Sequence, residues 1–186
     1  MTAAAHLPHL WTRLEYERLV ESGGFHPESR VELVDGEILD MAPQESRHAT
    51  GIRLTEDAMR IAFGEGFEVR AQLPLAIDGY SEPEPDIAVV TGSPRDYRDA
   101  HPATAALIVE VADSSLAFDR TRKLALYARN GIPEYWILNL VDGALEVHRD
   151  PAGETYASRS VLAASEHIAP LHAPGDRAVA VADLLP

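Results

Sequence analysis

Two carboxylates in apolar runs and a single lysine are the residues best suited to chemistry. Asp86 stands in the run P-D-I-A-V-V, and Glu110 lies inside L-I-V-E-V-A. A carboxylate in a buried strand is costly unless it is paired, hydrogen-bonded or bound to a cation. Magnesium is typically held by one or two carboxylates together with water and phosphate oxygens. We therefore expect Asp86 and Glu110 to hold one Mg²⁺ ion, or Mn²⁺ in its place. The alternatives are a turn residue after Pro85 for Asp86 and an arginine partner for Glu110.

Lys123 is the only lysine, and every other residue among the sixteen Lys and Arg is arginine. A compact ammonium beside a metal could stabilise charge on a phosphoryl group or orient the attacking water. Lys123 also follows Asp119 at the i,i+4 spacing, so the second interpretation is an ordinary ion pair on a helix surface. The spacing alone leaves both interpretations open.

Composition limits the partners and the chemistry. The 186 residues carry a formal net charge of −14 and include no cysteine. Structural disulfides and thiolate metal sites are therefore excluded. The acidic balance predicts weak binding to DNA, with Arg120 and Arg122 as candidate phosphate contacts. The sequence shows no signal-peptide pattern and no apolar stretch long enough to span a bilayer, so we expect a cytoplasmic protein without membrane contact.

Capping and turn signals predict the elements that must position these residues. Thr12 and Glu15 form a capping box at the start of a helix over 12–21, and Asp35-Gly36 predicts the turn of a hairpin over 30–41. Strict alternation predicts a strand over 67–77, with Pro74 indicating an edge or a bulge. Apolar and helical patterns add helices within 43–64 and 118–129, and strands over 87–90, 105–112, 134–140 and 144–149.

This order of elements predicts an α/β fold with a mixed sheet flanked by helices. We expect one domain over 1–186. Within it, a helix and hairpin extension covers 10–41, the core covers 43–149, and a C-terminal arm covers 150–186.

A known family combines these features. The chain resembles the Uma-type restriction endonucleases of the PD-(D/E)XK nuclease superfamily, over roughly residues 10–150. The most specific part is the segment 105–136. The resemblance implies a restriction-endonuclease-like fold and a catalytic set of Asp86, Glu110 and Lys123. In the usual superfamily motif the lysine stands two residues after the glutamate, where this chain has Ala112; the resemblance implies that Lys123 on the following helix takes its place. The likeness is carried by Pro85-Asp86, Glu110-Val111-Ala112, Asp119, Lys123, Tyr127-Ala128, G-I-P-E-Y-W over 131–136, V-E-L-V-D-G-E over 31–37, and His48.

Several residues have two interpretations at this stage. Asp119 either orients Lys123 or simply pairs with it. Glu32 matches a family position and could approach the site, although a glutamate on a hairpin is usually solvated. His48 could be a base or a substrate contact, although a histidine near a helix start is more often a surface residue.

The favoured function is a Mg²⁺-dependent endonuclease acting on DNA, with a homodimer as its expected assembly. The alternative is a non-catalytic interaction module on the same fold, which the acidic charge favours. A glycosidase using two carboxylates is a weak third interpretation because the chain has few aromatic residues for a sugar cleft.

Overall fold

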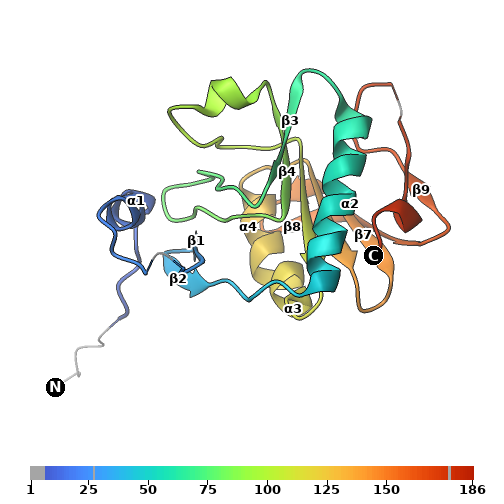
Figure 1. Ribbon diagram of the computed structural model, residues 1–186. Coiled ribbons are helices and arrows are strands. Elements are labelled where there is room, and N and C mark those ends of the chain that lie inside the picture. Colours follow the sequence, from blue (N-terminus) through green and yellow to red (C-terminus); the bar gives the residue numbers. More distant parts are fainter. Residues whose placement is uncertain (1–6, 27, 176) are drawn as a thin grey trace.

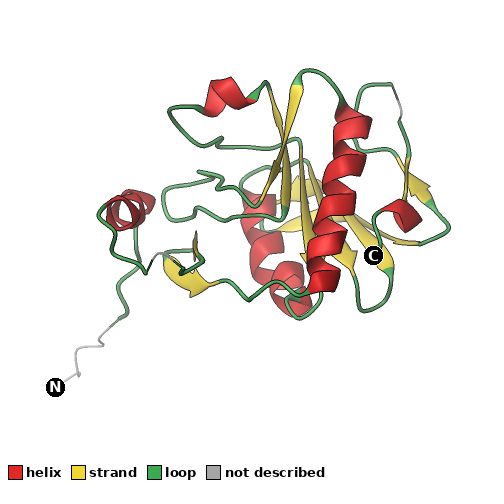
Figure 2. Ribbon diagram, in the orientation of Figure 1, coloured by secondary structure: helices red, strands yellow, loops and turns green. Residues whose placement is uncertain are grey.

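The computed structural model describes residues 7–26, 28–175 and 177–186. Its centre is a six-stranded sheet in the order β3-β4-β5-β6-β7-β8. Strands β5 and β6 are parallel, and the other neighbouring pairs are antiparallel. Figure 2 shows this mixed sheet with helices around it, so the predicted α/β class is confirmed. The strands are β3 (Phe67–Ala71), β4 (Ile87–Thr91), β5 (Leu107–Ala112), β6 (Glu134–Asn139), β7 (Ala144–Ala152) and β8 (Thr155–Ala163).

Helices cover both faces of the sheet (Figure 1). The long helix α2 (Ser46–Phe63) packs on one face through Ile52, Met59 and Phe63, which are buried as the apolar periodicity predicts. The short helix α4 (Leu124–Arg129) belongs to the second core cluster, on the opposite face. The strands are therefore buried on both sides, which explains their nearly continuous apolar runs.

Helix α2 approaches strand β5 closely at Gly51. A Cβ atom at this position would lie 3.0 Å from Cγ1 of Val111. This glycine lets the first half of α2 lie against the strand that carries Glu110.

The N-terminal helix and hairpin follow their sequence signals. Helix α1 (Arg13–Glu21) begins after Thr12, and both hydrogen bonds of the predicted capping box are present. Strands β1 (Val31–Val34) and β2 (Glu37–Asp40) form the predicted antiparallel hairpin. Its turn residues Asp35 and Gly36 both have positive φ, as a tight two-residue turn requires.

The strand predicted over 67–77 is too long, because β3 ends at Ala71. Gln72 has a φ of 51°, which breaks the extended backbone. Its N–H lies 3.2 Å from the carbonyl oxygen of Pro85 and 3.1 Å from that of Asp86. Pro74 lies beyond the end of β3, so the edge or bulge position predicted for it within a strand is wrong, although β3 itself is the first strand of the sheet. The chain turns away here, where hydrogen bonds from Gln72 to the residues just before β4 replace the ladder.

The connection from β5 to β6 is the segment that carries Lys123. The predicted helix over 118–129 is divided into α3 (Leu116–Phe118), a π-helical turn η2 (Asp119–Lys123) and α4. In the π turn the N–H of Leu124 reaches the carbonyl of Asp119, five residues back. Such turns are rare and occur frequently at functional sites.

The C-terminal residues contribute more to the core than the predicted arm implies. The boundary expected after residue 149 falls inside β7, and β8 completes the sheet. The remaining elements are β9 (His167–Ile168), β10 (Val179–Ala180) and the short 3₁₀ helix η3 (Val181–Asp183). Val181 and Leu184 are fully buried on the α2 side. A further 3₁₀ helix, η1 (Pro94–Tyr97), lies between β4 and β5.

Candidate active site

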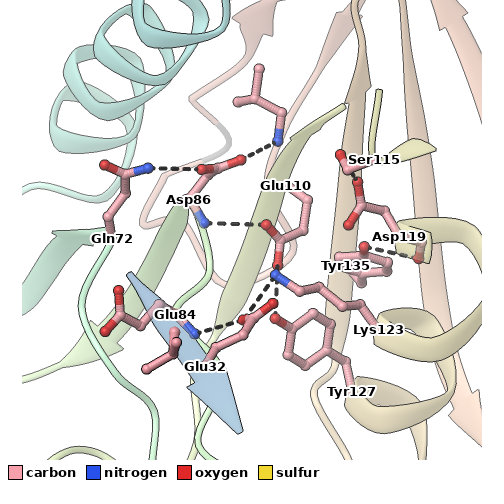
Figure 3. Close-up of polar contacts among 12 residues, drawn as sticks. Glu32, Gln72, Glu84, Asp86, Glu110, Ser115, Asp119, Lys123, Tyr127 and Tyr135 are labelled. Carbon is pink, nitrogen blue, oxygen red and sulfur yellow. Dashed lines mark hydrogen bonds and ion pairs between the residues drawn. The ribbon is translucent and has the colours of Figure 1, made fainter. Parts of the chain in front are cut away.

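Asp86 stands directly before β4 and is held on both carboxylate oxygens (Figure 3). Its Oδ2 accepts the N–H of Val111 at 2.9 Å. Its Oδ1 lies 3.2 Å from Nε2 of Gln72 and 3.2 Å from Nε2 of His48. The hydrogen bond to Asp86 raises the pKa of His48, and burial opposes this shift. Asp86 is therefore fixed rather than free to rotate.

Glu110 projects from the middle of β5 beside Asp86, as Figure 3 shows. The N–H of Asp86 donates to Glu110 Oε2 at 3.3 Å. Glu110 Oε1 accepts from the Lys123 ammonium at 3.0 Å and from the Tyr127 hydroxyl at 2.8 Å. Burial raises the pKa of Glu110 to about 8; the Lys123 ammonium opposes the rise and Asp86 adds to it.

Lys123 is buried between two carboxylates. Its side chain is 7% exposed, and Nζ lies 3.0 Å from Glu110 Oε1 and 3.3 Å from Glu32 Oε2. Burial acts to lower the pKa of Lys123, but the attraction of Glu110 and Glu32 outweighs it and the pKa is raised. The ammonium is therefore charged at neutral pH. The alternative interpretation, in which Lys123 forms an exposed ion pair with Asp119 on a helix surface, is therefore wrong.

Asp119 does not touch Lys123 among the contacts of the described residues. Its carboxylate accepts the Ser115 hydroxyl at 2.6 Å, and its carbonyl accepts the Tyr135 hydroxyl at 3.1 Å. The π turn explains this, because its wider backbone ring breaks the i,i+4 stacking of an α-helix. Burial raises the pKa of Asp119 to about 6, while Lys123 and the Ser115 hydrogen bond lower it.

Glu32 makes the N-terminal hairpin part of the site. It is 6% exposed, and besides Lys123 it accepts the N–H of Glu84 at 3.1 Å. The expectation that a hairpin glutamate is solvated is wrong here. The hairpin does not simply extend the core, because it supplies one wall around the lysine.

A cleft of about 440 Å³ unites these groups. Asp86, Glu110, Lys123, Asp119, Glu32 and His48 all line it, so the structure brings these six sequence-predicted residues together. The other lining residues are Arg30, Leu39, Asp40, Met41, Ala42, Gln44, Gln72, Glu84, Ser114, Ser115 and Phe118.

The two arginines expected to contact phosphate lie elsewhere. Arg120 donates through Nε to both carboxylate oxygens of Glu146, at 3.0 and 3.2 Å. Arg122 donates to Glu37 at 2.8 Å and so attaches the hairpin to the π turn. Neither arginine lines the cleft. Their proximity in sequence reflects two separate ion pairs rather than a basic patch at the site.

Gln72 and Tyr127 are site residues to which the sequence assigns no role. Gln72 reaches Asp86 only because its backbone has positive φ, which no pattern signals for glutamine. Tyr127 had a weak signal, since it is an aromatic residue at i+4 from Lys123 and within the resemblance. Its hydroxyl contact with Glu110 depends on the packing of α4 against β5.

The donor atoms fit a hard divalent cation. Asp86, directly before β4, and Glu110, within the neighbouring β5, offer carboxylate oxygens, which is the ligand type that magnesium takes. In the described part of the chain, no group of three or more His, Cys, Asp or Glu side chains is placed to share one ion. An ion here would be held by two carboxylates, with water and substrate completing its coordination.

Comparison with known proteins identifies the family. The sequence matches the Uma2 family, described as putative restriction endonucleases, over residues 14–182. The chain belongs to the Uma2 family. This Uma2 chain is also similar in fold to a putative nuclease belonging to DUF820 from Anabaena variabilis ATCC 29413. That crystal structure has a TM-score of 0.72 and 14% identity, covering 93% of this chain and 96% of that one. A search of curated proteins finds no match. Among the described residues of this Uma2 protein, no helix has the length and apolar character needed to cross a membrane.

Proposed function

We propose that this Uma2 protein is a metal-dependent endonuclease that hydrolyses phosphodiester bonds in DNA. One observation carries the proposal: Asp86, Glu110 and Lys123 converge in a single cleft. The backbone N–H of Asp86 lies 3.3 Å from Glu110, and the ammonium of Lys123 lies 3.0 Å from the same side chain. Family membership supports nuclease chemistry, and the DUF820 structure supports the fold.

Asp86 and Glu110 would hold Mg²⁺ or Mn²⁺. When bound, such an ion polarises a phosphate oxygen and lowers the pKa of a water molecule. The two carboxylates are already fixed for this task, Asp86 by the Val111 N–H and Glu110 by the Tyr127 hydroxyl. Their positions therefore cost little further ordering when a ligand arrives.

Lys123 would neutralise the negative charge that develops on the phosphate during hydrolysis. Glu32 and Glu110 hold its ammonium in the cleft. Asp119, predicted to orient Lys123, would act on it through charge without contact, since its carboxylate is bonded to Ser115. His48 donates to Asp86 when protonated, which gives it a supporting role at the ligand carboxylate.

The test is cleavage of varied DNA substrates with Mn²⁺ at low salt, combined with calorimetric titration of Mn²⁺ into the protein. Asp86→Asn should lose both cleavage and metal binding. Asp57→Asn is the matched control, because its side chain is 62% exposed on the outer face of α2. Cleavage by Asp86→Asn at the rate of the unchanged protein would contradict the proposal.

A non-catalytic interaction module is the second candidate. The buried ion pairs of Lys123 favour it, because the ammonium is already engaged by Glu110 and Glu32. The net charge of −14 also disfavours contact with a polyanion. Metal binding without cleavage of any DNA would favour this candidate. The expected homodimer is a further proposal, and sedimentation equilibrium tests it.

A further inference from the structure

We propose that the cleft takes single-stranded DNA, with one unpaired nucleotide seated against Phe118 while its phosphate reaches Asp86 and Glu110. This proposal rests on the nuclease function above and specifies its substrate class. Three features of the cleft carry it: the depth of the carboxylates, an apolar wall, and the charge of the lining.

The reacting groups lie deep in a small space. Asp86 is 6% exposed and Glu110 is 3% exposed. The cleft above them has a volume of about 440 Å³. Pockets of about 300–1,000 Å³ accommodate single small molecules. A phosphate reaches such a floor when it belongs to a flexible strand, whereas a rigid duplex holds its phosphates on a broad convex surface.

One wall of the cleft is apolar. Leu39, Met41 and Phe118 are among its lining residues, and all three are partly exposed. Phe118 and Leu39 also pack against the core beneath. The guanidinium carbon of Arg122 lies 5.7 Å from the Phe118 ring centroid, which holds the ring in place. An aromatic ring at a cleft offers a surface on which an unpaired base can stack. A base inside a duplex cannot reach this surface, because it is stacked between its neighbours.

The charge of the lining also disfavours a duplex. Six carboxylates line the cleft, whereas Arg30 and Lys123 are its only lysine or arginine residues in the described part of the chain. A duplex carries one charge per about 1.7 Å of axis, and one strand carries one per about 3.4 Å. A single strand therefore brings about half the repelling charge to an acidic protein.

The first experiment compares strands of one sequence in single-stranded form, as a blunt duplex, and as a duplex with an unpaired flap. With Mn²⁺ at low salt, we expect the single strand and the flap to be cut at least tenfold faster than the blunt duplex. Equal rates on the single strand and the blunt duplex would overturn the proposal.

The second experiment uses Phe118→Leu, which keeps apolar bulk but removes the stacking surface. Base–aromatic stacking typically changes affinity by about fivefold or more. We expect the KM for the single strand to rise by about that factor with kcat little changed. Phe67→Leu is the matched control, since Phe67 is a partly buried phenylalanine outside the cleft. An unchanged KM for Phe118→Leu, or an equal rise for Phe67→Leu, would overturn the role of Phe118.

Binding separates this proposal from the nuclease proposal. Fluorescence anisotropy of a labelled single strand, with Mn²⁺ present, needs no turnover. Binding that weakens in Phe118→Leu, without cleavage, would support the substrate class and overturn the nuclease function. Cleavage of the blunt duplex alone would support the nuclease function and overturn the substrate class. Absence of binding by any strand would overturn both.

Discussion

Replacing Lys123 with Met tests the buried charge balance of the site. Methionine keeps the length of the side chain but removes the ammonium that contacts Glu32 and Glu110 at 3.3 and 3.0 Å. Breaking a buried ion pair by removing one partner costs about 3–5 kcal/mol, because the remaining charge is left unpaired. An exposed pair would cost at most about 1 kcal/mol. The loss of stability therefore distinguishes a buried ion pair of Lys123 from an exposed one.

Urea denaturation at pH 8 measures this cost. With a urea m-value near 2 kcal/mol/M, within the usual range, we expect the midpoint of unfolding to fall by about 2 M. Arg53→Met is the control, since the Arg53 side chain is 66% exposed in its ion pairs on α2, and its midpoint should move little. Adding Glu32→Gln to Lys123→Met should recover part of the loss by removing one unpaired carboxylate.

The loss should also depend on pH. Burial raises the pKa of folded Glu110 to about 8 from the ordinary value of 4.5 even with Lys123 present. The folded state then binds this proton more tightly than the unfolded chain, so stability falls as pH rises from about 4.5 through about 8. Without the ammonium, the pKa of Glu110 rises further, so the fall in stability continues to higher pH and its total is larger. A midpoint within 0.3 M of the unchanged protein, taken as about 0.6 kcal/mol, at both pH 5 and pH 8 would refute the assignment of Lys123 as a buried, paired charge.

Three other changes test the contacts around the site. Gln72→Gly should relieve the strain of a positive φ. It should nevertheless weaken Mn²⁺ binding measured by calorimetry, because the amide contact with Asp86 is lost. An unchanged affinity for Mn²⁺ would show that Gln72 does not support the site. Arg120→Ala should cost about 1.5–3 kcal/mol of stability, because the Glu146 side chain is 1% exposed and loses one charged partner while Arg159 and Asn139 remain. It should leave the salt dependence of DNA binding unchanged, because Arg120 lies outside the cleft; a weaker salt dependence would restore it as a phosphate contact. NMR titration of the metal-free protein should give a pKa for His48 above 6.5, and Asp86→Asn should lower the pKa of His48. The same His48 pKa in the unchanged protein and in Asp86→Asn would contradict the hydrogen bond between the two side chains.

Sequence reasoning succeeds where the signal is local. The capping box at Thr12 and the turn at Asp35-Gly36 encode their own backbone geometry, and both are present. The carboxylates of Asp86 and Glu110 were recognisable because charge in an apolar strand needs a partner. That their side chains lie side by side follows from the adjacency of β4 and β5.

The failures concern contacts between distant segments. The alternation after Ala71 continues as if the strand did, but hydrogen bonds to the start of β4 turn the chain at Gln72. Glu32 is solvated in an isolated hairpin and buried only once Lys123 lies against it. Arg120 and Arg122 are neighbours in sequence, yet their partners come from a sheet strand and from the hairpin. None of these partners is specified by nearby residues.

The π turn makes the position of Lys123 tolerant of a one-residue change in chain length. In a regular helix each residue advances the side-chain direction by about 100°. The turn from Asp119 to Lys123 spans five residues where an α-helical ring spans four, so it acts as an insertion of one residue. Deleting Thr121, whose hydroxyl only bonds back to the carbonyls of its own helix, would restore regular spacing while keeping every charged residue. The lysine would then keep nearly its direction toward Glu110, because the deleted residue is the extra one that the π turn accommodates, and the net charge would be unaltered. Alignments of related chains should therefore allow one residue more or fewer between the glutamate and the lysine.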